Sequence, residues 1–425
     1  VNWGATGDRY FHPFSAFGFD IDGLGFHQVW HWLSDKQQQP PLDVFNIGAQ
    51  AAARAKFLRT NSDDPRSPLS QLRHAYHIDA GRYAAFLRRY AEQRGVVHID
   101  GRIESAQRDE TSGDITHLTL ASGDTVHGDF FIDCTGFRAL LIGETLGAGW
   151  IDWAHWLPCD RAIAVPSQPA RRLDTATRST AHDAGWCWRI PLQHRTGNGN
   201  VYCSAFMSDE AAEQTLLAGL DTAPTDTPRP LRFQTGRRDA LWYHNCVAIG
   251  LSSGFLEPLE STSIHLIQEG ISKLLALFPG EDDAAHQRTT YNQLMIRLYD
   301  DIRDFIVLHY HVNRNEQPFW RALREMKIPD TLAERIDGFQ ARGQWFAHRA
   351  DLFTETSWVA VMMGQGLAPS NHHPLLASLD TQRTQQQLNE MANVYGQASE
   401  HMPPHQAYIQ KFCMADDNAY QDKAS

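Results

Sequence analysis

The clearest periodic run of apolar residues lies between residues 80 and 94. Tyr83, Phe86, Leu87 and Tyr90 recur at spacings of three and four residues, which places them on one face of a helix. Gly95 follows this run, and glycine commonly ends a helix because it adopts the left-handed backbone conformation without steric cost. The pattern predicts an amphipathic helix over residues 80–94.

Shorter apolar runs after residue 95 predict strands. Apolar and polar residues alternate at 118–120, and the apolar runs at 130–132 and 246–249 are typical of buried strands. Two further strands are predicted within residues 186–207, around a turn at 196–199.

The remaining pattern divides the chain by character. Residues 1–35 are expected to be strand and loop, and residues 36–41 a turn. Residues 165–182 and 221–232 are expected to be long surface loops, and helices are expected from residue 263 onward, including 291–310, 331–350 and 380–395. We therefore expect an α/β (α+β) fold with a body over residues 1–265 and a mainly helical C-terminal layer over residues 266–425.

Composition and charge exclude several kinds of partner. The 425 residues carry a net charge of -12, which argues against nucleic acid or an anionic membrane as the main partner. No apolar run has membrane-spanning length. The six cysteines form no CxxC pair, which indicates buried, reduced thiols and a cytoplasmic location.

Two predicted strands end at a glycine. The run 131–135 leads to Gly136, and the run 247–249 leads to Gly250. In open α/β sheets ligands bind outside the carboxyl ends of strands, and glycine there lets the backbone approach a cofactor closely. The alternative is that both glycines serve only as turns.

A segment with anion-binding character follows Gly250. Ser261, Thr262 or Ser263 can cap the helix predicted after them, and the backbone N–H groups of a first helical turn attract anions. The segment can therefore hold a halide or cofactor oxygens, although an ordinary capped helix explains the same residues.

Two tryptophans lie two positions apart on a predicted strand. Trp186 and Trp188 therefore face the same side of the sheet. They form either a hydrophobic cluster or a wall beside a planar ligand.

Together these segments resemble the flavin-dependent, tryptophan-type halogenases. The motif WxWxIP matches at 186–191, FLEPLESTSIHL at 255–266 and DFFIDCTGFRALL at 129–141, and the segments 10–14, 77–80, 357–358 and 364–366 are also similar to that family. The resemblance implies a flavin-monooxygenase-like, FAD-binding fold. It also implies an oxidoreductase that uses FADH2 from a separate flavin reductase, oxygen and chloride or bromide. The implied product is a halogenated electron-rich aromatic, formed through hypohalous acid. Indole or an indole derivative is the expected substrate.

The resemblance also implies roles for individual residues. Glu260 would act on the oxidant or accept the ring proton, and Ser261 would position a reactive lysine. The other expected roles are halide binding by Thr262 and Ser263, cofactor binding by Gly136, Gly250, Leu251 and Ile264, a passage lined by Trp186, Trp188, Ile190 and Pro191, and substrate binding by His12, Pro13 and Phe14.

The chain departs from the family at its start. It shows no GxGxxG loop near residue 1 and no lysine at the place of the reactive one, so we expect a fragment that by itself neither binds FAD normally nor halogenates. The function that the resemblance implies is expected of the complete protein. Alternative functions are a flavin-dependent hydroxylase or a non-catalytic remnant. The residue after Gly250 is Leu251, where hydroxylases usually have Asp, which favours the halogenase.

No metal site is predicted. The pairs at 309–311 and 372–373 have no cysteine or acidic residues at ligand spacing, which indicates structural or surface histidines. The oligomeric state stays open, with a homodimer as one alternative.

Overall fold

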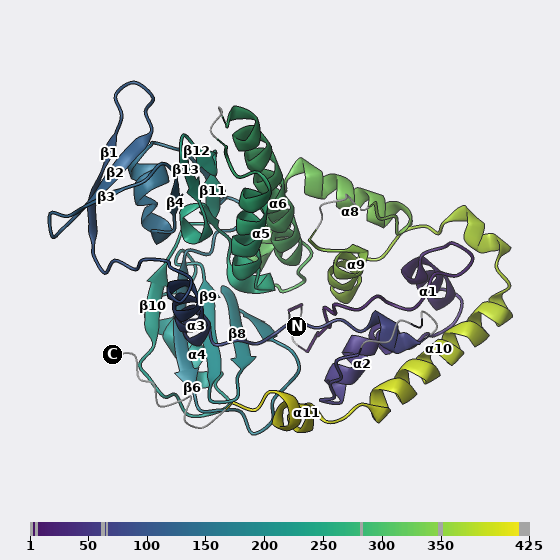
Figure 1. Ribbon diagram of the computed structural model, residues 1–425. Coiled ribbons are helices and arrows are strands. Elements are labelled where there is room, and N and C mark those ends of the chain that lie inside the picture. The colour runs from purple at the N-terminus through teal and green to yellow at the C-terminus, as the bar shows by residue number, and fades with distance from the viewer. Residues whose placement is uncertain are drawn as a thin grey trace. The chain divides into compact units, whose positions relative to one another are not determined.

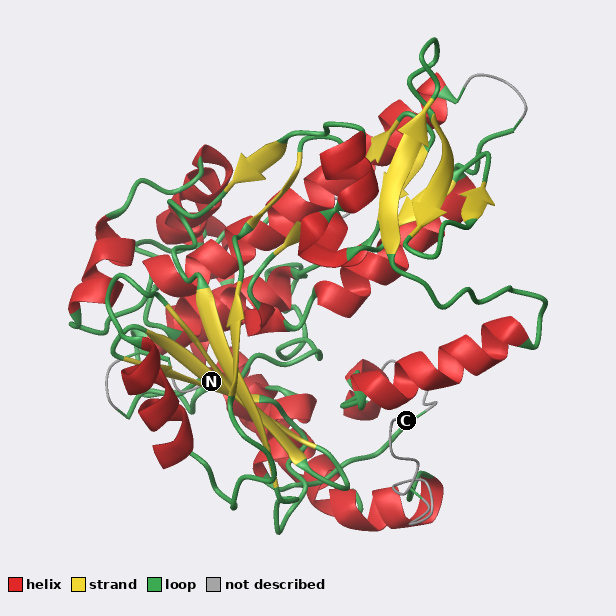
Figure 2. Ribbon diagram, turned by 90° about the vertical axis from the view of Figure 1, so that its left-hand side faces the viewer, coloured by secondary structure: helices red, strands yellow, loops and turns green. Residues whose placement is uncertain are grey.

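The computed structural model describes residues 3–4, 7–60, 64, 67–280, 284–346 and 352–415. Helices make up 42% of the chain and strands 17%, which confirms the mixed α and β class (Figure 2). Two compact units are interleaved along the sequence: unit 1 comprises residues 1–77, 162–231 and 307–425, and unit 2 comprises residues 78–161 and 232–306. The boundary expected at residues 265 and 266 falls within a helix of unit 2, so it coincides with neither unit.

Unit 1 contains a five-stranded sheet. Its strands are β6 (Arg161–Ser167), β7 (Arg178–His182), β8 (Gly185–Pro191), β9 (Thr196–Tyr202) and β10 (Arg229–Arg232), in the order β10-β6-β9-β8-β7. Helix α4 (Asp209–Ala218) lies against this sheet (Figure 1). Its residues Ala212 and Leu216 join Ile163, Val165 and Tyr202 in one buried cluster.

Three predictions for this region are wrong in part. The turn expected at 196–199 forms the start of β9, and the connection lies at 192–195, where the Leu192 N–H donates to the Arg195 carbonyl. The loops expected at 165–182 and 221–232 contain β7 and β10. Both are edge strands, and polar edge strands lack the apolar alternation that marks an inner strand.

A histidine is fixed at the end of β7. His182 Nε2 lies 2.6 Å from the Asn200 side-chain oxygen, and its Nδ1 accepts from the Ala184 N–H at 3.3 Å. The neutral ring satisfies both contacts. Burial disfavours the charged form of the ring and lowers the pKa of His182, and the contact with Asn200 offsets part of that effect.

Helices form the rest of unit 1. They are α1 (Phe26–Ser34), α2 (Ile47–Ala53), α7 (Pro318–Glu325), α8 (Asp330–Arg342), α9 (Glu355–Gly364), α10 (Thr381–His401) and α11 (His405–Phe412). Helices α8 and α10 confirm the predicted helices near 331 and 380, while residues 347–350 lie outside the described residues. The prediction of strand and loop for 1–35 is wrong at α1, where Val29, Trp32 and Leu33 are buried on one face.

Unit 2 contains three three-stranded sheets. The first is β1 (Ile103–Arg108), β2 (Ile115–Leu120) and β3 (Thr125–His127). The second joins β5 (Trp150–Asp152), β11 (Gly236–Arg238) and β14 (Gly254–Phe255). The third is β12 (Trp242–Tyr243), β13 (Cys246–Ala248) and β4 (Phe131–Asp133). Its helices are α3 (Ala80–Glu92), α5 (Ser263–Ala276) and most of α6 (Ala285–His311), within which the last unit boundary falls.

The predicted elements of unit 2 are confirmed, but their exposure differs from expectation. β13 is fully buried, whereas Ile132 in β4, the edge strand of the same sheet, is 48% exposed. No residue of α3 is buried, so its apolar face stays exposed in the part of the chain that the structure describes. The apolar residues Ile264, Ile271 and Leu275 of α5 are also exposed, and the buried residues of this helix are Leu266, Gly270 and Leu274.

The cysteines are free, as predicted, but not all are buried: Cys134 and Cys413 are exposed. Among the described residues, no helix combines the length and the apolar character that crossing a membrane requires.

Candidate active site

Two strand ends meet at one edge of a sheet in unit 2. β4 and β13 pair in parallel, with Asp133 opposite Ala248, so their carboxyl ends lie together. Gly136 and Gly250 follow with φ values of 76° and 77°, a conformation that glycine adopts at no steric cost. A Cβ added to Gly136 would meet no atom within 4 Å, so this edge is open to a ligand.

The buried Asp133 carboxylate organises the turn after β4. It accepts hydrogen bonds from the Thr135 N–H (2.9 Å) and hydroxyl (2.7 Å), and from the N–H groups of Leu141 and Ile142 (2.9 Å each). Its backbone carbonyl accepts from the Ile249 N–H at 3.0 Å, which links the two strand ends. No role was assigned to Asp133 from the sequence, although a carboxylate at the end of a buried strand signals such a cap.

Glu260 ends a short 3-10 helix, Pro258–Glu260, ahead of α5. Its side chain is partly exposed, whereas Glu257 is fully buried. Ser261 follows with φ 56°, a left-handed conformation that costs a non-glycine residue on the order of 1 kcal/mol and turns the chain into α5.

The N-terminus of α5 has no side-chain cap. Thr262 occupies the N-cap position, but its side chain accepts no capping hydrogen bond. The prediction that Ser261, Thr262 or Ser263 caps this helix is therefore wrong. First-turn N–H groups that no side chain caps retain their partial positive charge, which favours an anion. Ile264 and Leu251 are each 38% exposed in this unit.

The two tryptophans of β8 lie in unit 1 and share one face, as predicted, with ring centroids 6.0 Å apart. Trp186 is fully buried and contacts Trp3, whose ring also meets Trp320 at 5.2 Å. The hydrophobic-cluster interpretation is thus confirmed for Trp186. Trp188 is partly exposed and packs over Gly199, its partner on β9.

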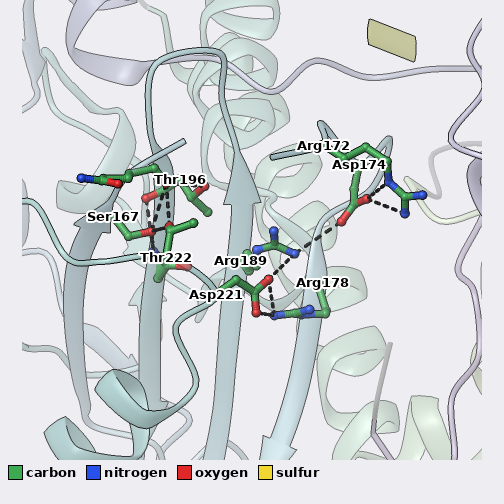
Figure 3. A network of polar contacts seen from close by, with 10 residues as sticks. Ser167, Arg172, Asp174, Arg178, Arg189, Thr196, Asp221 and Thr222 are labelled. Atoms are coloured by element: carbon green, nitrogen blue, oxygen red, sulfur yellow. Dashed lines mark hydrogen bonds and ion pairs between the residues drawn. The ribbon is translucent and has the colours of Figure 1, made fainter. Parts of the chain in front are cut away.

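A charged network lies beside these tryptophans on β8. The Arg189 side chain, 13% exposed, contacts Asp221 at 2.8 Å and Asp174 at 3.4 Å (Figure 3). Arg178 also pairs with Asp221, and Arg172 with Asp174. The network fixes the loops on either side of the strand. At the strand end, Pro191 is buried, Ile190 is half-buried, and the Pro191 carbonyl lies 3.2 Å from His77 Nδ1.

The expected substrate segment also lies in unit 1. The His12 ring lies 6.2 Å from the ring of Phe353, Pro13 is buried, and Phe14 is 66% exposed. A cavity of about 390 Å³ opens beside the same segment, walled by Tyr10, Phe11, Phe17 and Trp30. His12 and Phe14 do not line this cavity.

The expected residues therefore form two sets. Unit 2 holds Gly136, Gly250, Leu251 and the segment 260–264, and unit 1 holds residues 12–14 and 186–191.

The fold is that of the flavin-dependent halogenases. The chain superposes on BrvH, a flavin-dependent halogenase from Brevundimonas sp. BAL3, with a TM-score of 0.93 and 43% identity, covering 96% of this chain and 84% of that one. For Xcc4156, a flavin-dependent halogenase from Xanthomonas campestris, the TM-score is 0.94 at 41% identity, covering 98% and 83% of the two chains.

Curated relatives and a family model agree with this class. The 7-chloro-L-tryptophan 6-halogenase KtzR of Kutzneria sp. (strain 744) is 37% identical over 440 residues, which are 96% of this chain and 84% of the relative. The tryptophan halogenase family model matches residues 1–381, and the chain therefore belongs to this family of enzymes.

Proposed function

We propose that the protein halogenates an electron-rich aromatic, indole or an indole derivative, with chloride or bromide, oxygen and FADH2 from a separate flavin reductase. One observation carries the proposal. A single short segment of unit 2 leads from Gly250, at the open strand edge, through Glu260 to the uncapped N-terminus of α5. A cofactor edge, a carboxylate and an anion-attracting helix end thus follow one another in the chain.

The strand edge fits a flavin. Gly136 and Gly250 let the backbone approach a planar group closely, and Leu251 and Ile264 offer exposed apolar side chains. Reduced FAD, when bound, supplies with oxygen the oxidation of halide to hypohalous acid. The N–H groups of Thr262 and Ser263 would hold the halide, because they lie at the positive end of α5.

Glu260 is the residue we assign to the chemistry. In the halogenation step a ring carbon bonds to the halogen of hypohalous acid and the O–halogen bond breaks. The hydroxyl leaves with the bonding electrons and takes up one proton to become water, and the ring carbon loses one proton to a base, so the protons balance. The Glu260 carboxylate is partly exposed and can accept that proton or polarise the oxidant. Ser261, in its left-handed turn, joins Glu260 to the N-terminus of α5.

Unit 1 supplies the substrate side of the proposal. His12 and Phe14 would stack against the aromatic ring of the substrate, and the buried Pro13 lies between them in the chain. Trp188 would contribute an accessible indole wall to the passage. Trp186, Ile190 and Pro191 would support that wall from the buried side. We favour free indole over tryptophan, because among the described residues we assign no side chains to an amino acid's charged groups.

The test is an indole bromination assay on the full-length protein. The assay supplies FAD, a flavin reductase, NADH, bromide and indole, and mass spectrometry measures bromoindole. Glu260→Gln is compared with Glu269→Gln, a matched change on α5 at a residue paired with Lys273. Loss of a general base typically costs about 10²–10⁴-fold in rate, so Glu260→Gln should lose activity by that factor and Glu269→Gln should keep it.

The products separate the alternatives. Hydroxyindole in place of bromoindole would indicate a flavin-dependent hydroxylase. Bromoindole at equal rates from both variants would remove Glu260 from the chemistry.

A further inference from the structure

Two histidines and an aspartate converge on the surface of unit 1. His31 lies in the last turn of α1, Asp35 is the residue that ends this helix, and His372 comes from the segment before the 3-10 helix Pro374–Ser378. A spacing of four residues places His31 and Asp35 on one side of the helix. One donor atom from each of the three residues lies within 4.8 Å of the other two.

The sequence could not reveal this cluster. The spacing around His372 and His373 predicts no metal site, because no cysteine or acidic set lies at metal-ligand spacing in the chain. The fold supplies Asp35 from 337 residues away, with its carboxylate 2.8 Å from His372 Nε2.

The geometry around His31 suits a metal ligand. Its Nε2 lies 3.0 Å from the Pro369 carbonyl oxygen, and with that nitrogen donating, Nδ1 keeps its lone pair. Metal-binding histidines commonly donate their second ring nitrogen to a carbonyl in this way, which fixes the ring and its tautomer. The His31 and His372 ring centroids are 5.2 Å apart.

We propose that His31, Asp35 and His372 bind a divalent transition-metal ion of the Zn²⁺ type, independently of the halogenase reaction. Two imidazoles and one carboxylate suit Zn²⁺ or Co²⁺, whereas Mg²⁺ and Ca²⁺ prefer oxygen ligands alone. Three protein ligands leave a fourth position for water. The ion would tie the end of α1 to the segment at 369–373.

Small side-chain movements complete the site. Tetrahedral ligands about 2.0–2.1 Å from Zn²⁺ lie roughly 3.4 Å from one another. The three donor atoms lie within 4.8 Å of one another, so no separation has to close by more than about 1.4 Å, and the 2.8 Å contact between Asp35 and His372 has to open slightly. The side chains of Asp35 and His372 are 57% and 31% exposed and can rotate. The nearby cation Lys36 is turned elsewhere, with its Nζ 3.6 Å from the Trp32 ring centroid and in contact with the Thr381 hydroxyl.

An ordinary ion pair is the competing explanation. A pair between protonated His372 and Asp35 accounts for their 2.8 Å contact but gives His31 no part in the cluster. A metal ion uses both imidazoles in their neutral form. The site also has a structural consequence, because His31 lines the 390 Å³ cavity together with Trp30 and Ser34. Metal binding would thus stiffen one wall of that cavity.

The test is metal titration of the tag-free, full-length protein after chelator treatment and desalting. Calorimetry measures the stoichiometry and Kd of Zn²⁺, and visible absorption reports the coordination of Co²⁺. His372→Asn is compared with His373→Asn, the same change at the neighbouring residue, whose ring caps the Leu375 N–H instead. This control is needed because the chain contains 21 histidines.

We expect one equivalent of Zn²⁺ to bind with a micromolar Kd. His372→Asn and Asp35→Asn should weaken binding at least tenfold, and His373→Asn should leave it unchanged. Circular dichroism of the metal-free variants verifies that they are folded. No binding by the unaltered protein, or equal binding by His372→Asn and the unaltered protein, would overturn the proposal.

Discussion

Gly199 is the position at which the placement of Trp188 can be tested most directly. The two residues are directly opposite each other on β8 and β9. A Cβ built on Gly199 lies 2.0 Å from Cζ2 and 2.1 Å from Cη2 of the Trp188 ring. Ordinary van der Waals contact begins near 3.4 Å, so in Gly199→Ala the indole must move by more than 1 Å.

The cost of this movement follows from the overpacking of a tight contact. Such substitutions typically destabilise a protein by about 1–3 kcal/mol. For a domain of about 150–250 residues, each kcal/mol of destabilisation lowers the thermal unfolding midpoint by about 2–4 °C. A cost of about 2 kcal/mol for Gly199→Ala therefore corresponds to a midpoint lowered by roughly 4–8 °C. Differential scanning calorimetry measures the midpoint, and tryptophan fluorescence reports the displaced ring.

Gly197→Ala is the matched control on the same strand. Its added Cβ would meet only the Arg195 side chain at 3.4 Å and the Ile190 carbonyl at 3.8 Å, which are ordinary contacts. The control should unfold at or slightly above the midpoint of the unaltered protein, because alanine reduces the entropy of the unfolded chain. Equal midpoints for Gly199→Ala and Gly197→Ala would refute the packing argument.

A second substitution tests whether Trp188 is the cause. Replacing Trp188 with Leu removes the ring that the new methyl group meets, so Gly199→Ala should cost less in the Trp188→Leu background. The coupling free energy between contacting residues is typically about 0.5–3 kcal/mol. Purely additive effects would place the strain elsewhere.

Three further outcomes are expected. Arg189→Met should lower the free energy of unfolding by about 1–2 kcal/mol. The loss is smaller than for a fully buried ion pair, because Asp221 is 42% exposed and still pairs with Arg178. An unchanged unfolding midpoint would contradict this expectation. Because burial lowers the folded pKa of His182 below its usual value of about 6.5, the unfolded chain takes up the proton first. The unfolding midpoint should therefore fall as pH drops below about 6.5, and His182→Gln should flatten that slope in scans at pH 7.5 and 5.5. Burial also raises the pKa of Cys187 to about 12, so mass spectrometry after iodoacetamide treatment at pH 8 should find exposed Cys413 labelled and Cys187 unlabelled until the protein is denatured.

Local pattern was sufficient for the long helices and for the strand ends of the site. The helices near residues 80, 263, 291, 331 and 381 follow from apolar spacing, and Gly136 and Gly250 follow from apolar runs that stop at glycine. Their exposure could not be predicted, because it depends on which elements cover them. The apolar face of α3 shows this most clearly.

The wrong predictions of secondary structure came from polar residues that are buried in the fold. Asn198 and Asn200 resemble turn residues, yet both are buried in β9, where their side chains donate to the Ser167 hydroxyl and the Ala212 carbonyl. Histidines interrupt the apolar pattern of α1 in the same way, since buried His27 contacts the Gly343 carbonyl. Such partners come from distant segments, and no local pattern records them.

The cofactor edge and the Asp35–His372 contact also differ in whether their residues lie close together in the sequence. Gly250 and Glu260 lie on one short stretch of chain, so a motif can reveal them. Asp35 and His372 meet only after the chain has folded, so their chemistry is visible only in three dimensions.

The interleaving of the two units sets an order for folding during synthesis. The last residue of unit 2 is Ile306, whereas unit 1 also needs residues 307–425. At a translation rate of about 5–20 residues per second, that final stretch takes on the order of ten seconds to emerge. During this interval the five-stranded sheet of unit 1 has all its strands, but Trp3 lacks its aromatic partners Tyr310 and Trp320. A nascent chain stalled in this window would therefore lack the contacts that cover Trp3 in the folded protein.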